Sequence, residues 1–180
     1  MKKALYLFPV LLVLTGWQAE VSGAGEIGTR LKAREPVRVY IGTFADESGT
    51  KQFTTGSFRK KLSDALATRR SLKFQVAEQA VGSDIQISGT VLQCQYLERG
   101  PLKIIPNAGM MAMDAVKTAT MNYVELTVRF IVTDTKTGQV FWNDTNSQYL
   151  KELLTKSEAH ETINNKVIKS FISNCFGKPK

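Results

Sequence analysis

The side chains that most often carry catalysis are few in this chain, and they stand apart along the sequence. His160 is the only histidine, so a zinc site built from several histidines is excluded. It stands between Glu158 and Glu161 near the start of a helical segment, where we expect it to face water. The acidic residues are scattered singly, and no pair stands out for acid–base catalysis. We therefore predict a protein that is not an enzyme and that holds no cofactor and no metal.

One loop has a superficial likeness to a phosphate-binding loop. It runs from Gly42 to Lys51, but six residues separate its two glycines and its threonine precedes the lysine. The motif requires four residues between the glycines and a serine or threonine after the lysine. The loop also places Asp46 and Glu47 where the phosphate should lie, so we do not predict nucleotide binding.

The chain has two cysteines, Cys94 and Cys175. In an oxidising compartment such a pair can form a disulfide, and their spacing matches no zinc motif. The sequence does not show whether the two residues meet the distance that a disulfide requires, so a bonded and an unbonded pair both stay open. Cys175 continues the apolar face of the C-terminal helical segment, and we expect it to point towards the sheet.

The chain is basic, with 24 lysines and arginines against 16 aspartates and glutamates. A basic exported protein meets anionic lipids or acidic partners before it meets nucleic acid, so we predict no nucleic-acid partner. Five cations stand in two dense runs, and we predict that they contact an anionic ligand such as the phosphates of lipopolysaccharide. The alternative is a basic surface that is only solvated. The five cations are Arg59, Lys60, Lys61, Arg69 and Arg70.

The segment 98–121 is the most unusual part of the sequence, because it holds four of the five methionines. A long connection between two strands is commonly functional, and methionine side chains make adaptable apolar contacts. We predict that this insert binds a partner, and the alternative is a flap that packs over the sheet. The candidate contact residues are Leu102, Ile104, Ile105, Met110, Met111 and Met113.

Alternating apolar and polar residues predict five strands. Four of these patterns cover 37–44, 72–76, 84–97 and 123–134, and a returning strand begins at 140. The third pattern changes face, which indicates a bulge near Gly89. The last two strands form a predicted hairpin, whose turn over 134–138 places Gly138 where a positive φ is needed.

Helical spacing of apolar residues appears in two segments, 58–66 and 157–176. Thr55 or Ser57 is the expected cap of the first helix. The order of elements is strand, helix, two strands, the insert, two strands and a helix. This order predicts an α+β fold, a two-layer sandwich in which two helices cover one face of a mixed sheet of four to five strands.

Residues 1–24 have the three parts of a secretory signal peptide. Two lysines precede an apolar run over 4–14, and Ser22 and Ala24 occupy the −3 and −1 positions of a cleavage site. The run has about eleven residues, too few for a membrane-spanning helix of roughly 20. We therefore expect export and processing.

Behind the signal we expect a polar lead-in over 25–36 and one domain over 37–176, interrupted by the insert. The sequence Leu14-Thr15-Gly16 commonly precedes the lipidated cysteine of a bacterial lipoprotein, yet Trp17 follows it here. Tryptophan has no thiol to acylate. The chain is either a soluble relative of such lipoproteins or one whose cysteine has been replaced, and association with a membrane stays open.

Three stretches together resemble the outer-membrane assembly lipoproteins. Val37–Ser48 resembles their opening strand, which is followed by phenylalanine, a small residue, an acidic residue and a polar residue. Gly82–Val91 resembles their strand with an aspartate before alternating apolar residues and a glycine. Val128–Trp142 resembles their hairpin with Asp-x-x-Thr-Gly-x-Val-x-Trp. The pattern is shared by the lipopolysaccharide-assembly lipoprotein LptE, the penicillin-binding-protein activator lipoproteins and the curli-secretion channel lipoproteins.

The resemblance implies a periplasmic protein at the outer membrane. The function that it implies is that of a non-enzymatic, LptE-like assembly accessory. Its expected partners are an outer-membrane β-barrel or another envelope protein, together with lipopolysaccharide. One alternative is an activator or accessory subunit of cell-wall synthesis, secretion, or flagellar or pilus machinery. Another is a soluble periplasmic ligand-binding protein or enzyme.

Overall fold

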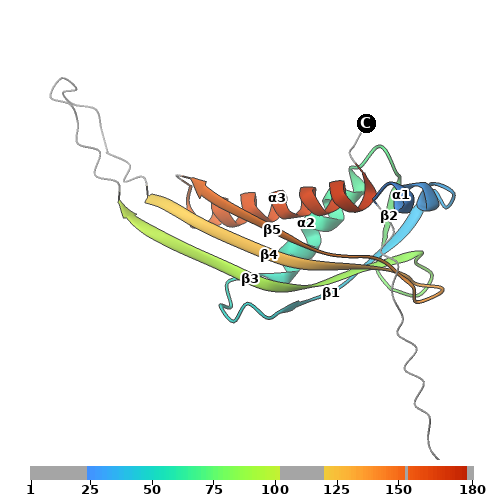
Figure 1. Ribbon diagram of the computed structural model, residues 1–180, viewed down its shortest axis with the longest axis horizontal. Helices are drawn as coiled ribbons and strands as arrows, with labels where there is room; N and C mark the ends of the chain where they lie inside the picture. Colours follow the sequence, from blue (N-terminus) through green and yellow to red (C-terminus); the bar gives the residue numbers. More distant parts are fainter. Residues whose placement is uncertain (1–23, 102–119, 153, 178–180) are drawn as a thin grey trace, which may run out of the picture.

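The computed structural model describes residues 24–101, 120–152 and 154–177. Five strands form one sheet in the order β2-β1-β3-β4-β5, with helices packed against it (Figure 1). The strands are β1 (Val37–Asp46), β2 (Phe74–Ala77), β3 (Ile85–Pro101), β4 (Thr120–Asp134) and β5 (Val140–Glu152). The helices are α1 (Ala24–Lys32), α2 (Thr55–Ala67) and α3 (Lys156–Phe176). The predicted α+β class with a mixed sheet is therefore confirmed.

The sheet combines a parallel half with an antiparallel half. β1 is parallel to β2 and to β3, whereas β3, β4 and β5 are antiparallel neighbours. The predicted hairpin of the last two strands is thus present. The two edges differ, because β2 has 4 residues and β5 has 13. The antiparallel half consequently ends in a long edge strand.

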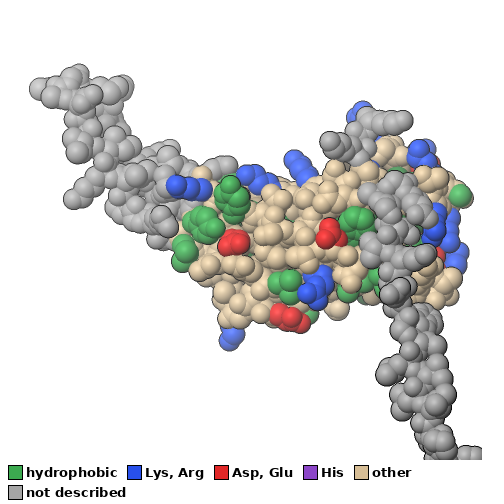
Figure 2. Space-filling view, viewed as in Figure 1, with side chains coloured by type: hydrophobic (Ala, Val, Ile, Leu, Met, Phe, Trp, Pro, Cys, Tyr) green, Lys and Arg blue, Asp and Glu red, His purple; other side chains and the backbone are tan. Residues whose placement is uncertain are grey.

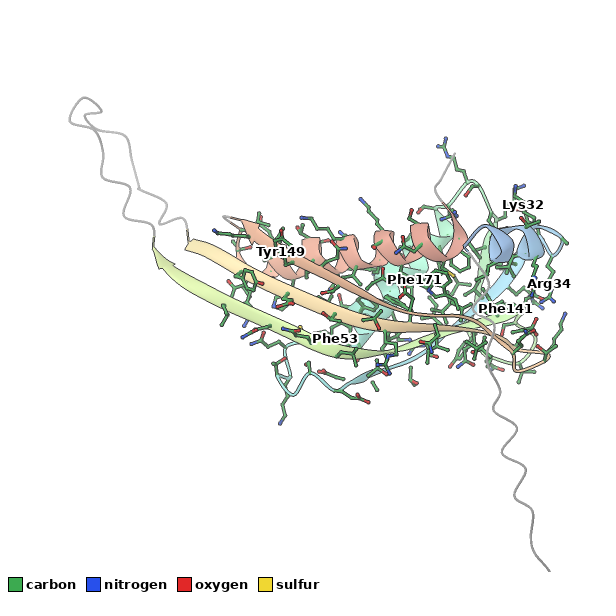
Figure 3. All side chains as sticks on the ribbon, in the orientation of Figure 1. Lys32, Arg34, Phe53, Phe141, Tyr149 and Phe171 are labelled. Atoms are coloured by element: carbon green, nitrogen blue, oxygen red, sulfur yellow. The ribbon has the colours of Figure 1, made fainter. Side chains whose placement is uncertain are left out.

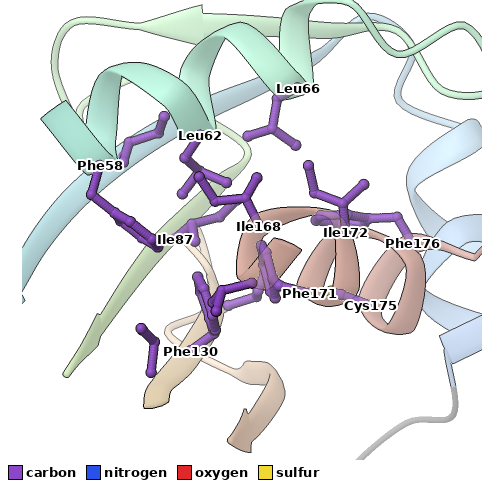
Figure 4. Close-up of a cluster of buried hydrophobic side chains, with 14 of the residues drawn as sticks. Phe58, Leu62, Leu66, Ile87, Phe130, Ile168, Phe171, Ile172, Cys175 and Phe176 are labelled. Atoms are coloured by element: carbon purple, nitrogen blue, oxygen red, sulfur yellow. The ribbon is translucent and has the colours of Figure 1, made fainter. Parts of the chain in front are cut away.

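Four phenylalanines join both helices to one face of the sheet, and Figure 4 shows three of them, Phe58, Phe130 and Phe171. Phe130 of β4 and Phe171 of α3 stack with their ring centroids 4.1 Å apart and their planes 5° apart. Phe58 of α2 lies 6.2 Å from the ring of Phe130 and 5.2 Å from that of Phe44 on β1. All four side chains are buried. The two predicted helices therefore share one layer, and the opposite face of the sheet carries the polar residues of the strands.

The segment that we expected to be a polar lead-in is largely a helix. α1 covers Ala24–Lys32, and its residues Ile27 and Leu31 are each 1% exposed. Their spacing of four places both on one side of the helix, which packs against α3. The core consequently begins before residue 37.

The predicted bulge near Gly89 is present in β3, three residues further along the strand. Val91 and Gln93 pair with neighbouring residues of β4, so Leu92 is the extra residue of the strand. Gly89 is instead a place of close approach, because a Cβ atom there would lie 2.8 Å from the ring of Phe44. The change of face in the sequence thus located the bulge to within three residues.

Asp134 organises the turn between β4 and β5. Its buried carboxylate accepts hydrogen bonds from the backbone N–H groups of Lys136 and Thr137, at 2.8 and 3.0 Å. It also pairs with Arg34 Nη1 at 2.8 Å, and Gly138 has the predicted positive φ, of 71°. Burial alone would raise the pKa of this carboxyl, but the hydrogen bonds from Arg34, Thr137 and Lys136 outweigh burial and hold the pKa below its usual value.

We predict that Asp134→Asn removes part of the dependence of stability on acidic pH. A carboxyl whose folded pKa lies below its ordinary 3.8 stabilises the fold above that value, and the stabilisation is lost as the pH falls through the folded pKa. The amide cannot pair with Arg34, so we expect a loss of about 1–3 kcal/mol at neutral pH. Chemical unfolding of both proteins from neutral to strongly acidic pH measures the difference. A difference that stays constant over that range would contradict the prediction.

Candidate functional site

Three of the five predicted anion contacts have partners inside the protein. Arg59 Nη2 donates to the carbonyl oxygen of Ile41 at 2.6 Å. Lys61 Nζ pairs with Glu161 at 2.8 Å. Arg69 binds the end of α3, as described below, while Lys60 and Arg70 are exposed. Binding of an anionic ligand by these five residues stays a prediction.

Arg69 closes the C-terminal end of α3. Its Nη2 atom donates to the carbonyl oxygens of Phe176 and Gly177 at 2.9 and 2.7 Å, and its Nη1 atom to that of Ile172 at 3.4 Å. The last carbonyls of a helix have no partner within the helix and carry its negative partial charge. Burial lowers the pKa of Arg69, and the Cys175 thiol acts in the opposite direction.

We predict that Arg69→Gln lowers the free energy of unfolding by about 1–2 kcal/mol, because the C-terminal carbonyls of α3 lose their cation. The matched control is Arg70→Gln, which removes an exposed cation from the adjacent position. Thermal unfolding of the two variants measures the effect, and equal melting temperatures would contradict this role of Arg69.

The two cysteines are buried and unbonded, so the disulfide that the sequence left open is absent. Cys94 lies near the start of α3, because His160 of this helix stacks on Tyr96, two residues from Cys94. Cys175 follows His160 by 15 residues, roughly 22 Å along the helix axis, and a disulfide tolerates Cα atoms about 7 Å apart. Burial, and secondarily Asp46, raises the pKa of Cys94 to about 11. Burial also raises the pKa of Cys175, so neither thiol is a ready nucleophile.

The candidate contact residues of the insert, from Leu102 to Met113, lie outside the residues that the structure describes. The strands that lead to it, β3 and β4, are described up to Pro101 and from Thr120. Both reach beyond the helical layer at one end of the sheet (Figure 1). The predicted role of the insert in partner binding stays a prediction.

The outer face of the sheet exposes an apolar group near this end of β3, β4 and β5. Leu97 is 43% exposed and Tyr149 is 70% exposed. Leu97 pairs with Tyr123 on β4, and Tyr123 pairs with Lys151, two residues from Tyr149 on β5. Leu126 and Leu150 stand at alternate positions of β4 and β5 and are buried. The exposed Leu97 and Tyr149 therefore lie on the face opposite the helices. Figure 2 shows apolar and basic side chains at the surface, and Figure 3 places Tyr149 on β5.

A cavity of about 390 Å³ opens between the first turns of α2 and α3. Its lining includes Thr54, Ser57 and Lys61 from the region of α2, and Lys156, Ser157 and His160 from α3. The sequence gives no direct sign of it, because these residues come from two segments about 100 positions apart.

His160 is part of the cavity wall and is not the solvated side chain that we expected. Its ring stacks on Tyr96 with centroids 5.5 Å apart and planes at 24°, and Lys156 Nζ lies 5.3 Å from the centroid of the same tyrosine ring. Burial, and then the nearby Lys156, lowers the pKa of His160. Both effects favour the neutral form of the His160 ring over the charged form.

Over the described residues, no helix has the length and apolar character needed to cross a membrane. In the same part of the chain, no group of three or more histidine, cysteine, aspartate or glutamate side chains is arranged to hold a metal ion. The absence of enzymatic activity stays a prediction.

No family model matches the chain, and no curated protein matches it. Among solved structures, a variant PelC dodecamer from Paraburkholderia phytofirmans has a TM-score of 0.51 and 14% identity, covering 77% of this chain and 88% of that chain. Lipoprotein GNA1162 from Neisseria meningitidis has a TM-score of 0.43 and 11% identity, covering 77% and 99%. The chain therefore shares the fold of PelC, and the structures that resemble it include bacterial lipoproteins.

Proposed function

We propose that this protein is a non-enzymatic accessory protein of the bacterial envelope that works by binding another protein along β5. The observation that carries this proposal is the sheet topology, because β5 has β4 on one side and no strand on the other among the described residues. A long edge strand offers unpaired N–H and C=O groups to a partner.

The sequence of β5 does little to prevent such pairing. Natural edge strands are commonly protected by proline, by charged residues or by being short. β5 has 13 residues, and its middle, Thr145 to Leu150, contains neither a proline nor a charged side chain. Tyr149 adds an exposed aromatic ring, which suits protein interfaces. By contrast β2, at the opposite edge, has only 4 residues.

We infer that the partner is a further copy of the same chain. PelC, which has this fold, forms a dodecamer in its solved structure. This favours the accessory-subunit alternative of the sequence analysis. The finer LptE-like role, with a β-barrel partner, lipopolysaccharide and a place at the outer membrane, stays a prediction.

We predict that Tyr149→Lys weakens self-association at least about tenfold, because a lysine on an edge strand opposes pairing. The side chain is 70% exposed, so the fold of the subunit should not change. Sedimentation over a range of protein concentrations measures the association.

The control is Val81→Lys, which places the same charge on a side chain that is 90% exposed in the loop between β2 and β3. Self-association that is equally strong in both variants would argue against β5 as the interface. A wild-type protein that stays monomeric at every concentration would refute self-association itself.

A further inference from the structure

Two helices begin beside the cavity, but only one of them begins with a carboxylate. In α3, Thr155 caps the helix and Glu158 returns a hydrogen bond, so both residues form a capping box. In α2, Thr54 occupies the corresponding N-cap position, but its side chain makes no capping hydrogen bond. Ser57 stands where α3 has its glutamate, and the first turn of α2 holds no acidic residue. The first N–H groups of α2 are therefore left without a carboxylate.

The cavity instead contains cations, which the start of a helix disfavours. Lys61 is matched by Glu161 at 2.8 Å. Lys156, the first residue of α3, takes part in no ion pair within the described part of the chain, and its ammonium group lies near the Tyr96 ring. The lining holds two lysines, Lys61 and Lys156, and one glutamate, Glu161, so one positive charge is left in excess. Positive side chains at the start of a helix depart from the usual placement of charges, and such departures are expected at functional sites.

The opposite ends of the same helices show why an anion belongs in this cavity and not beside Arg69. α2 and α3 are parallel, since their first turns line the cavity and Arg69, just beyond α2, binds the last carbonyls of α3. Each helix start carries roughly half a positive charge and each helix end roughly half a negative one. At the C-terminal ends, Arg69 already donates its hydrogen bonds to the last carbonyls of α3. At the starts, the helices add to the lysine charge.

We propose that the cavity between the first turns of α2 and α3 binds a phosphate group, held by Lys156 and by the hydroxyls of Ser57 and Ser157. Lysine ammonium groups and hydroxyls are suitable donors to phosphate oxygens. A volume of about 390 Å³ admits the phosphate together with part of the molecule that carries it. The group can belong to a free phosphate or to a phosphomonoester lipid headgroup. This site does not depend on β5 or on the proposed self-association.

The first test is titration of the full chain with inorganic phosphate by calorimetry, at constant ionic strength set with sodium chloride. Lys156→Gln should weaken binding at least about tenfold, since it removes the unpaired cation. Lys73→Gln, which removes an exposed lysine outside the cavity, should leave the affinity unchanged. Equal losses in both variants, or no heat beyond that of chloride, would overturn the site.

The second test places a carboxylate in the first turn of α2 by substitution. Ser57→Glu completes a Thr-x-x-Glu capping box at α2 like the one at α3, so the melting temperature should rise and phosphate binding should be abolished. The charge-matched control is Gln79→Glu, in the exposed loop after β2, which should change neither. Phosphate binding that survives in Ser57→Glu would overturn the proposal, even if the variant is more stable.

The source of the phosphate is distinguished by a parallel arm with phosphatidylcholine vesicles that do or do not contain phosphatidic acid. Sedimentation of the wild-type protein with the phosphatidic acid vesicles, together with no sedimentation of Ser57→Glu and Lys156→Gln, supports a lipid headgroup. Binding of inorganic phosphate without vesicle binding supports a free phosphate. Absence of both would overturn the site.

Discussion

The packing of Phe171 on Phe130 is the contact on which the rest of the structure depends. It fixes α3 to the centre of the sheet, and Phe58 brings α2 into the same aromatic cluster. With all three rings buried, truncating any one of them would leave a cavity in the core, at a cost of about 3–5 kcal/mol. Because both helices are held on one face, the other face and the β5 edge are left to interact with something else.

The same packing sets the electrostatics of the molecule. Parallel helices place two positive helix starts together and two negative helix ends together. At the helix ends, Arg69 binds the last carbonyls of α3. At the starts, only α3 has an acidic cap, Glu158, and Lys156 adds a further positive charge. The direction of the helices therefore decides which cations are structural and which are available for a ligand.

The strands and α3 could be predicted from the sequence because their apolar residues repeat over many positions. α1 could not, because Ile27 and Leu31 form a repeat too short to distinguish from chance. The roles of the basic residues were also beyond the sequence. Arg69 and Lys61 find their partners about 100 residues away on α3, and only tertiary packing creates those contacts. The cavity was beyond the sequence for the same reason, because its lining comes from two segments about 100 residues apart.

Amide hydrogen exchange shows whether β5 is an edge strand that pairs with another chain. In an antiparallel edge strand, alternate N–H groups point away from the neighbouring strand. In monomers at low concentration, these β5 amides should exchange fast while their neighbours bonded to β4 are protected. In the assembled protein the same alternate amides should become protected. Fast exchange of these amides in both states would contradict the account.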